Sequence, residues 1–148
     1  MTELKEKTQN ALDESRTLIL GAQILLGALY RTIFEPGYHE LPPESRFLVL
    51  CALGLITVVV GLLIAPAPYH RIVEGGQDDH EFTSYVLRIM MIALLPFALS
   101  LGISLYIFVT KAVGSLYGII AGAGATVTAL FLWYGLRLMP RHEKDEQN

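Results

Sequence analysis

Charged residues are scarce in this chain and are missing altogether from three long intervals. Only 17% of the 148 residues are Asp, Glu, Lys or Arg, whereas 53% are hydrophobic, which is more apolar and less charged than a soluble domain of this size usually is. No such charge occurs in residues 47–69, 89–110 or 112–136. Each interval matches the roughly 20 residues that an α-helix needs to cross a bilayer. The missing charge therefore predicts a membrane protein.

Several residue patterns that carry chemistry are also absent. The chain has one cysteine, Cys51, so it cannot form an intramolecular disulfide. The sequence shows no zinc-ligand spacing, phosphate-binding loop or nucleophile elbow, and no two histidines stand three or four residues apart. The formal net charge of -3 provides no basic patch for nucleic acid. We therefore expect no catalytic residues, no metal site, no cofactor and no nucleic-acid partner.

A fourth apolar segment lies near the N-terminus. Residues 18–30 are apolar except for Gln23, and they are flanked by Arg16 and Arg31. Long arginine stems reach the headgroups at both ends, and one polar residue makes too narrow a polar face for a helix that lies in the interface. The sequence thus predicts an all-α, polytopic membrane protein with one domain over residues 1–148 and transmembrane helices at about 14–34, 46–66, 88–110 and 112–136.

Lysine and arginine are distributed unevenly between the two sides of the predicted bundle. Eight lie in the N-terminal segment, the connection between the second and third spans, and the C-terminal tail 137–148: Lys5, Lys7, Arg16, Arg71, Arg88, Arg137, Arg141 and Lys144. The other side carries three, Arg31, Arg46 and Lys111. Because cytoplasmic loops are enriched in these residues, we expect an antiparallel bundle with both termini and the charged tail in the cytoplasm.

Polar residues gather towards the inner ends of the first two spans. This boundary cluster consists of Glu14, Arg16, Gln23, His70, Arg71 and Glu74. One interpretation is that these groups anchor helix ends at the lipid headgroups; the other is that they bind an anion or relay protons, with His70 as the group that titrates near neutral pH. Gln23 lies deeper, and an amide at membrane depth is costly without a partner. We therefore expect Gln23 to face the interior of the bundle.

Glycine recurs at every fourth residue in the fourth span. Gly114, Gly118 and Gly122 are followed at the same interval by Thr126. These positions share one face of a helix, and small residues on such a face let another backbone approach closely. The pattern predicts a helix-packing seam, and it leaves open whether the partner helix belongs to the same chain or to a second copy.

Two motifs stand out beyond these patterns. The first helix contains E-x-R followed by G-x-Q-x-L, within DESRTLILGAQILLGALYRTIF, and the second span is followed by A-P-x-x-x-H-R, within LLIAPAPYHRIVEGGQDD. Together with ALLPFALSLGISLYI, they resemble an uncharacterised family of small bacterial four-helix membrane proteins over most of residues 10–110. Some members are labelled sodium:proton antiporters. The resemblance implies residence in the bacterial cytoplasmic membrane, and it supplies no catalytic residues to carry over.

The functional interpretation ranks association above transport. We expect a non-enzymatic inner-membrane protein, in contact with the lipid bilayer, that binds a second copy of itself or another membrane protein. The alternative is a small transporter that exchanges a monovalent cation for protons through the boundary cluster. Exchange of this kind normally uses a carboxylate in mid-membrane, and the apolar stretches of the four spans contain no Asp or Glu.

Overall fold

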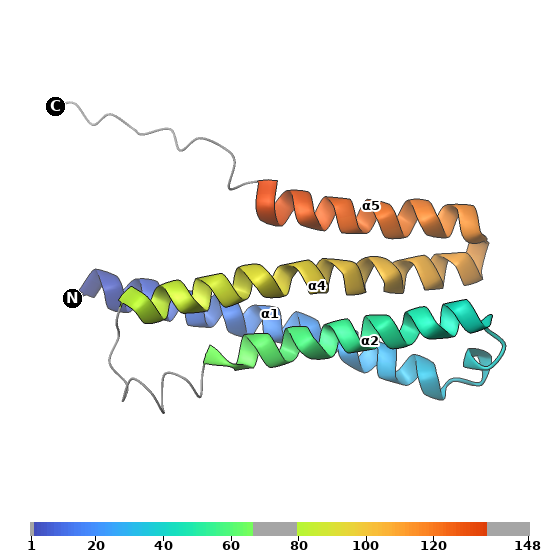
Figure 1. Ribbon diagram of the computed structural model, residues 1–148, viewed down its shortest axis with the longest axis horizontal. Helices are drawn as coiled ribbons and strands as arrows, with labels where there is room; N and C mark the ends of the chain where they lie inside the picture. The colour runs from blue at the N-terminus through green and yellow to red at the C-terminus, as the bar shows by residue number, and fades with distance from the viewer. Residues whose placement is uncertain (1, 67–79, 136–148) are drawn as a thin grey trace.

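The computed structural model describes residues 2–66 and 80–135, and this part of the chain forms four long helices and one short 3₁₀ segment (Figure 1). The elements are α1 (Thr2–Phe34), η1 (Pro36–Tyr38), α2 (Pro43–Ile64), α4 (His80–Val113) and α5 (Ser115–Tyr134). All four long helices are long and apolar enough to cross a bilayer. The prediction of an all-α membrane protein with four spanning helices is confirmed.

The helices are not arranged as an evenly packed bundle. α1, α2 and α4 pack against one another, whereas α5 packs almost entirely against α4 and lies on the side of α4 away from α1 and α2 (Figure 1). Consecutive helices run antiparallel, so the start of α1 and the end of α5 lie at the same end of the molecule. Large faces of α1 and α5 therefore have no neighbour within the described chain.

Proline and glycine define the helix ends. Pro43 begins α2, where its missing N–H costs nothing, and α2 ends at Ile64, two residues before Pro66. Gly114 alone separates α4 from α5 and has a φ of 120°, a conformation that side chains other than glycine rarely adopt. Two residues of the predicted fourth span, at positions 112 and 113, consequently belong to α4, and the fourth helix begins at Ser115.

Two helices are longer than the predicted spans. α1 has 33 residues and α4 has 34, which corresponds to about 50 Å at 1.5 Å per residue, against a hydrocarbon core of about 30 Å. The predicted spans 14–34 and 88–110 cover only the apolar parts. Both helices continue beyond these parts at the end of the molecule where α1 begins (Figure 1).

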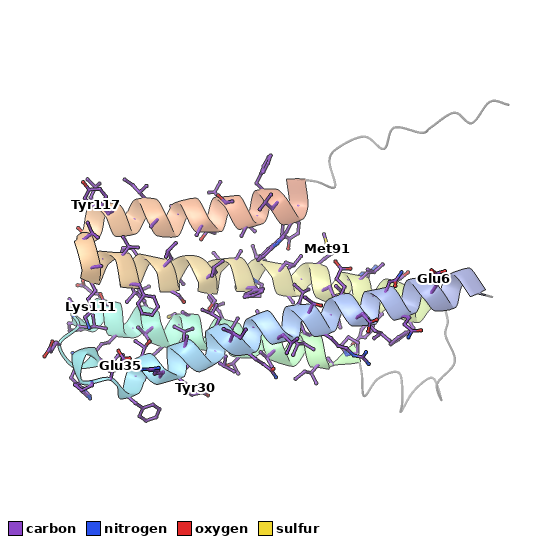
Figure 2. All side chains as sticks on the ribbon, turned by 180° about the vertical axis from the view of Figure 1, so that it is seen from behind. Glu6, Tyr30, Glu35, Met91, Lys111 and Tyr117 are labelled. Atoms are coloured by element: carbon purple, nitrogen blue, oxygen red, sulfur yellow. The ribbon has the colours of Figure 1, made fainter. Side chains whose placement is uncertain are left out.

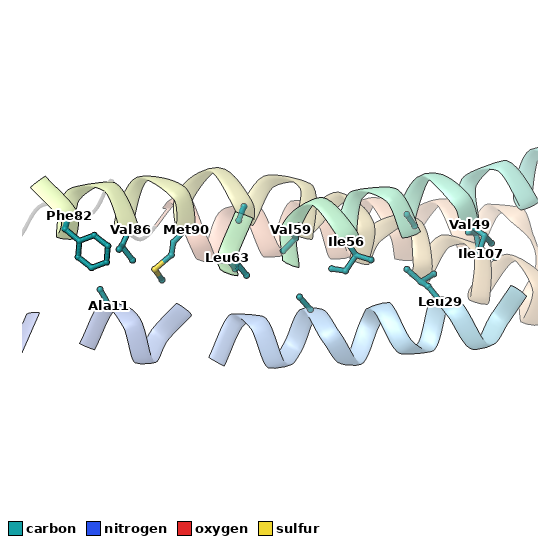
Figure 3. Packing of buried hydrophobic residues seen from close by; sticks show 13 residues of the cluster. Ala11, Leu29, Val49, Ile56, Val59, Leu63, Phe82, Val86, Met90 and Ile107 are labelled. Carbon is teal, nitrogen blue, oxygen red and sulfur yellow. The ribbon is translucent and has the colours of Figure 1, made fainter. Parts of the chain in front are cut away.

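The core lies between α1, α2 and α4 (Figure 3). Its largest fully buried side chain is that of Phe82, near the start of α4, which lies beside Ala11 of α1. Further along, the contributions come mainly from α2: Val49, Ala52, Ile56, Val59 and Leu63. The apolar span of α4 starts at Ser84, so the core begins before this span, at Phe82. The part of the core around Phe82 is shielded from water, and the rest packs within the membrane.

Buried serine hydroxyls connect the three core helices. Ser15 of α1 donates a hydrogen bond to the carbonyl oxygen of Leu63 at 3.3 Å, near the end of α2. Ser100 of α4 donates to the carbonyl oxygen of Ala52 at 2.9 Å. Both serines are at least 96% buried. These bonds hold α1 and α4 to α2 at two different depths.

Candidate functional site

The predicted glycine seam lies between α4 and α5 of one chain. A Cβ atom built on Gly122 would lie 2.7 Å from the carbonyl oxygen of Gly102 and 2.8 Å from the Cβ of Tyr106. A Cβ built on Gly118 would lie 2.9 Å from the carbonyl oxygen of Tyr106 and would also meet the hydroxyl of Thr110. Contacts this short do not occur between real atoms of these types, so the two helices approach closely only because both positions are glycine.

The seam has a second half that the sequence analysis missed. Gly102, Tyr106 and Thr110 follow one another at intervals of four on α4 and face Gly118, Gly122 and Thr126 of α5. Thr126 lies against Gly102, and its hydroxyl donates to the carbonyl oxygen of Gly122 at 3.0 Å. The same four-residue spacing was visible in the third span. Gly114 lies outside the seam, because a Cβ at that position would have no atom within 4 Å, and its role is the turn.

Aromatic residues hold α5 to α4 at the other end of the hairpin. The ring of Trp133 stacks on that of Phe97, with centroids 5.6 Å apart and planes inclined by 25°. The hydroxyl of Tyr134 donates to the carbonyl oxygen of Met91 of α4, the residue labelled in Figure 2. Hydroxyls at membrane depth require such acceptors. α5 is therefore fixed to α4 at both of its ends.

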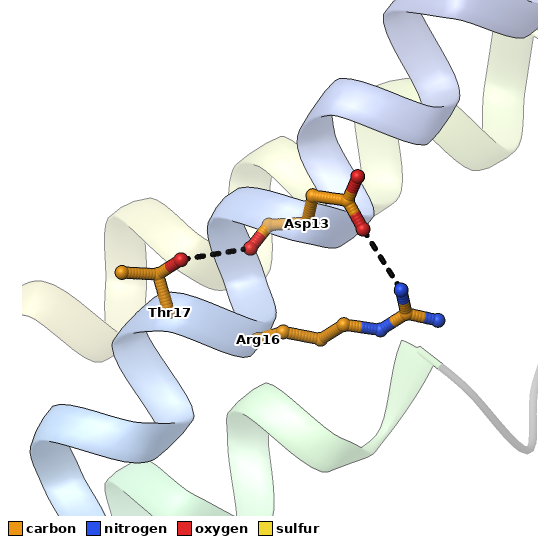
Figure 4. Close-up of polar contacts among 3 residues, drawn as sticks. All are labelled: Asp13, Arg16 and Thr17. Atoms are coloured by element: carbon orange, nitrogen blue, oxygen red, sulfur yellow. Dashed lines mark hydrogen bonds and ion pairs between the residues drawn. The ribbon is translucent and has the colours of Figure 1, made fainter.

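The boundary cluster is only partly visible in the structure. Glu14 and Arg16 are both exposed on α1, and the Arg16 guanidinium pairs at 2.8 Å with the carboxylate of Asp13, three residues earlier, instead of with Glu14 (Figure 4). His70, Arg71 and Glu74 lie outside the described residues. The Asp13–Arg16 ion pair is exposed at 59% and 76% of its side chains, and exposed pairs of this kind contribute about 0–1 kcal/mol to stability.

A hollow of about 280 Å³ lies beside Arg16, between α1 and the end of α2. Its walls are formed by Leu12, Ile19, Leu63, Ile64 and Pro66. The hydroxyl of Ser15, which also lines it, is already engaged with the Leu63 carbonyl oxygen. The hollow therefore has one charged side chain at its rim, that of Arg16, which is already paired with Asp13.

A larger hollow of about 440 Å³ runs along the seam between α4 and α5 and reaches Leu48 of α2. Tyr106 and Thr126 are the lining residues with polar side chains, and the hydroxyl of Thr126 donates to the carbonyl oxygen of Gly122. No carboxylate or imidazole lines it. Within the described ranges, no three His, Cys, Asp or Glu side chains are grouped so that they could hold a metal ion.

The prediction that Gln23 faces the interior of the bundle is wrong. Gln23 is exposed, and its amide makes no hydrogen bond to any other described residue. The buried face of α1 is formed instead by Ala11, Ser15, Ala22 and Leu29. Gln23 follows Ala22 and is therefore turned about 100° away from that face. An amide in lipid needs a hydrogen-bond partner, but no residue in the described part of the chain provides one for Gln23.

Comparison with known proteins places the chain in a family without a known function. Residues 3–137 match a family described as "Family of unknown function (DUF6328)". No curated protein matches the chain, and no solved structure does.

Proposed function

The chain belongs to the DUF6328 family of unknown function, and we propose that it is a non-enzymatic integral membrane protein that acts by associating, within the bilayer, with a second copy of itself or with another membrane protein. Gln23 is the observation that carries this proposal. It lies in the span Gln9–Phe34, about 16 Å along the helix axis from Phe34. That distance is about half of a 30 Å hydrocarbon core, so the exposed amide stands near the middle of the bilayer.

An unpaired amide at this depth is energetically unfavourable. Transfer of such a group from water to an apolar medium without a hydrogen bond costs about 1–3 kcal/mol in proteins. Leu20 and Ile24, which flank it on the exposed surface, are 62% and 75% exposed and need no partner, because lipid tails solvate apolar side chains as well as another helix does. A helix of a second subunit would satisfy Gln23, and lipid tails cannot.

We further propose that the protein resides in the bacterial cytoplasmic membrane with both termini inside. The antiparallel order of the four helices supports the placement of both ends on one side. The bias of lysine and arginine towards that side supports its assignment to the cytoplasm.

Cation/proton exchange remains the second candidate, because the hollow beside Arg16 combines a charge with a cleft at the predicted membrane boundary. Its physical difficulty is the lack of an acid within the apolar stretches. Glu14 is exposed on α1 and does not line that hollow. Exchange would appear as a cation-dependent collapse of a pH gradient across proteoliposomes.

Photocrosslinking in native membranes tests the association. With a benzoylphenylalanine at position 24, next to the intact Gln23, we expect irradiation to yield covalent adducts with protein. The matched control carries the same group at position 58, on the lipid-facing side of α2, where Val58 is 55% exposed, and should yield lipid adducts only. If neither position forms an adduct with protein, the proposed function is wrong.

A further inference from the structure

We propose that α1 is the interface of a parallel homodimer in which Gln23 of one copy pairs with Gln23 of the other. This inference rests on the proposed function and identifies its partner as a second copy of this chain. The interface, which we name the α1 outer stripe, consists of six residues: Arg16, Leu20, Gln23, Gly27, Tyr30 and Phe34.

The spacing of the α1 outer stripe is that of a helix-pairing seam. The spacing between successive residues of the stripe alternates between four and three, which is the spacing at which two helices pack side by side in a coiled coil. All six are exposed in the single chain, and the helix they belong to is in front in Figure 2, with Glu6 and Tyr30 labelled towards its two ends. The buried face of α1 lies about 120° around the helix from this stripe, and it is already occupied, since Ser15, Ala22 and Leu29 are buried against the other helices.

Gly27 provides the close approach that a buried hydrogen bond needs. It lies one turn after Gln23, and a Cβ built on it would have no atom within 4 Å, so packing within the subunit does not account for this glycine. In contrast, Gly118 and Gly122 of α5 are explained by their close contacts with α4 in the same chain. A small residue beside a polar one on an open face is the combination that favours helix association in membranes.

Membrane topology selects a second copy as the matching partner. Two copies of one chain insert in the same direction, so a two-fold axis along the membrane normal sets two α1 helices parallel and places residue 23 opposite residue 23 at equal depth. The glutamine amide both donates and accepts hydrogen bonds, so two such amides satisfy each other reciprocally. A single polar residue in an otherwise apolar pairing stripe also fixes the register of the two helices.

The ends of the stripe are compatible with this arrangement. Two Arg16 side chains would approach each other at one end, but each is neutralised by its own Asp13 at 2.8 Å. At the other end, the exposed rings of Tyr30 and Phe34, 48% and 82% exposed, would stack or pack across the axis. The outer face of α5, by comparison, presents apolar groups such as Leu116 and Ile120, for which lipid is an adequate neighbour.

Disulfide crosslinking of the purified full-length protein in liposomes tests the dimer. In a Cys51→Ala background, Leu20→Cys should form a covalent dimer upon mild oxidation, and Val58→Cys on α2 should not. Adding Gln23→Leu to the Leu20→Cys protein should reduce dimerisation about tenfold, the effect of losing about 1.4 kcal/mol, whereas Gln23→Asn, which retains the amide, should preserve most of it. The subunit fold should be unaffected, because Gln23 makes no bond within it.

Each contrary result identifies a different failure. Crosslinking through Val58→Cys but not through Leu20→Cys would overturn the α1 interface while leaving self-association in place. Equal dimerisation of the wild type and Gln23→Leu would overturn the amide pairing. Absence of any dimer would overturn the homodimer, and the proposed function would then survive only if position 24 had crosslinked to a different protein in native membranes.

Discussion

Replacing Gly122 with leucine is expected to separate α5 from α4. Any side chain at this position meets the carbonyl oxygen of Gly102 at 2.7 Å, and a backbone atom within a helix cannot rotate away as a side chain can. Overpacking of a well-packed site costs about 1–3 kcal/mol and sometimes more, and here the whole seam must open. We expect the free energy of unfolding to fall by about 3 kcal/mol or more.

The chain contains its own probe and control for this prediction. Its one tryptophan, Trp133, stacks on Phe97 of α4, so its fluorescence during a denaturant titration reports the separation of the two helices. The control is Gly124→Leu, two residues along the same helix, where a Cβ meets nothing within 4 Å. We expect that variant to unfold within about 0.5 kcal/mol of the wild type. Equal stability of both variants would contradict the observed seam.

Truncation of Phe82 to alanine is expected to open the contact between α1 and α4. Phe82 is fully buried and precedes the apolar span Ser84–Val113, so its ring is shielded from water and not only from lipid. Loss of a buried phenylalanine side chain costs about 3–5 kcal/mol. In a Cys51→Ala background, the thiol of Ala11→Cys, a position only 5% exposed, should react about 100-fold faster once Phe82 is removed.

Phe108→Ala provides the matched control on the same helix. Phe108 is 49% exposed within the apolar part of α4, where lipid tails replace the lost contacts. We expect no more than a twofold change in the labelling rate of Ala11→Cys. A large effect of Phe108→Ala together with a small effect of Phe82→Ala would show that the core between α1 and α4 is not where the structure places it.

The four helices could be predicted because the pattern that marks them is read directly along the sequence. Intervals without charge mark the lengths of chain that tolerate lipid, and these lengths do not depend on how helices are arranged. The helix boundaries were less accessible. The first 12 or so residues of α1 are polar and helical, and hydropathy does not distinguish a polar helix from a polar loop.

The partners of individual residues were harder to predict than the elements. The spacing of Gly118 and Gly122 correctly indicated a packed face. It could not identify α4 as the neighbour, because small residues allow the backbone of any helix to approach closely. Gln23 was placed on the wrong side for a related reason. Its polarity indicated that it needs a partner, and the direction of that partner depends on which face of α1 the other helices cover.

The ion-pair partner of Arg16 was also not predicted, although it lies close by in the sequence. Asp13 stands three residues before it on the same helix, at a spacing that commonly forms ion pairs, but Asp13 was not among the residues of the predicted boundary cluster. The i,i+3 relation was readable from the sequence. His70, Arg71 and Glu74, the remainder of the predicted cluster, stay predictions, since they lie outside the described residues.

The central claim is that copies of this protein associate in the bilayer through α1. The most direct test is to count photobleaching steps from single molecules, labelled at Glu6→Cys in a Cys51→Ala background, in vesicles that contain few copies. We predict an excess of two-step traces over random co-occupancy, which Gln23→Leu should largely remove. Single-step traces at every protein density, identical for both proteins, would contradict the claim.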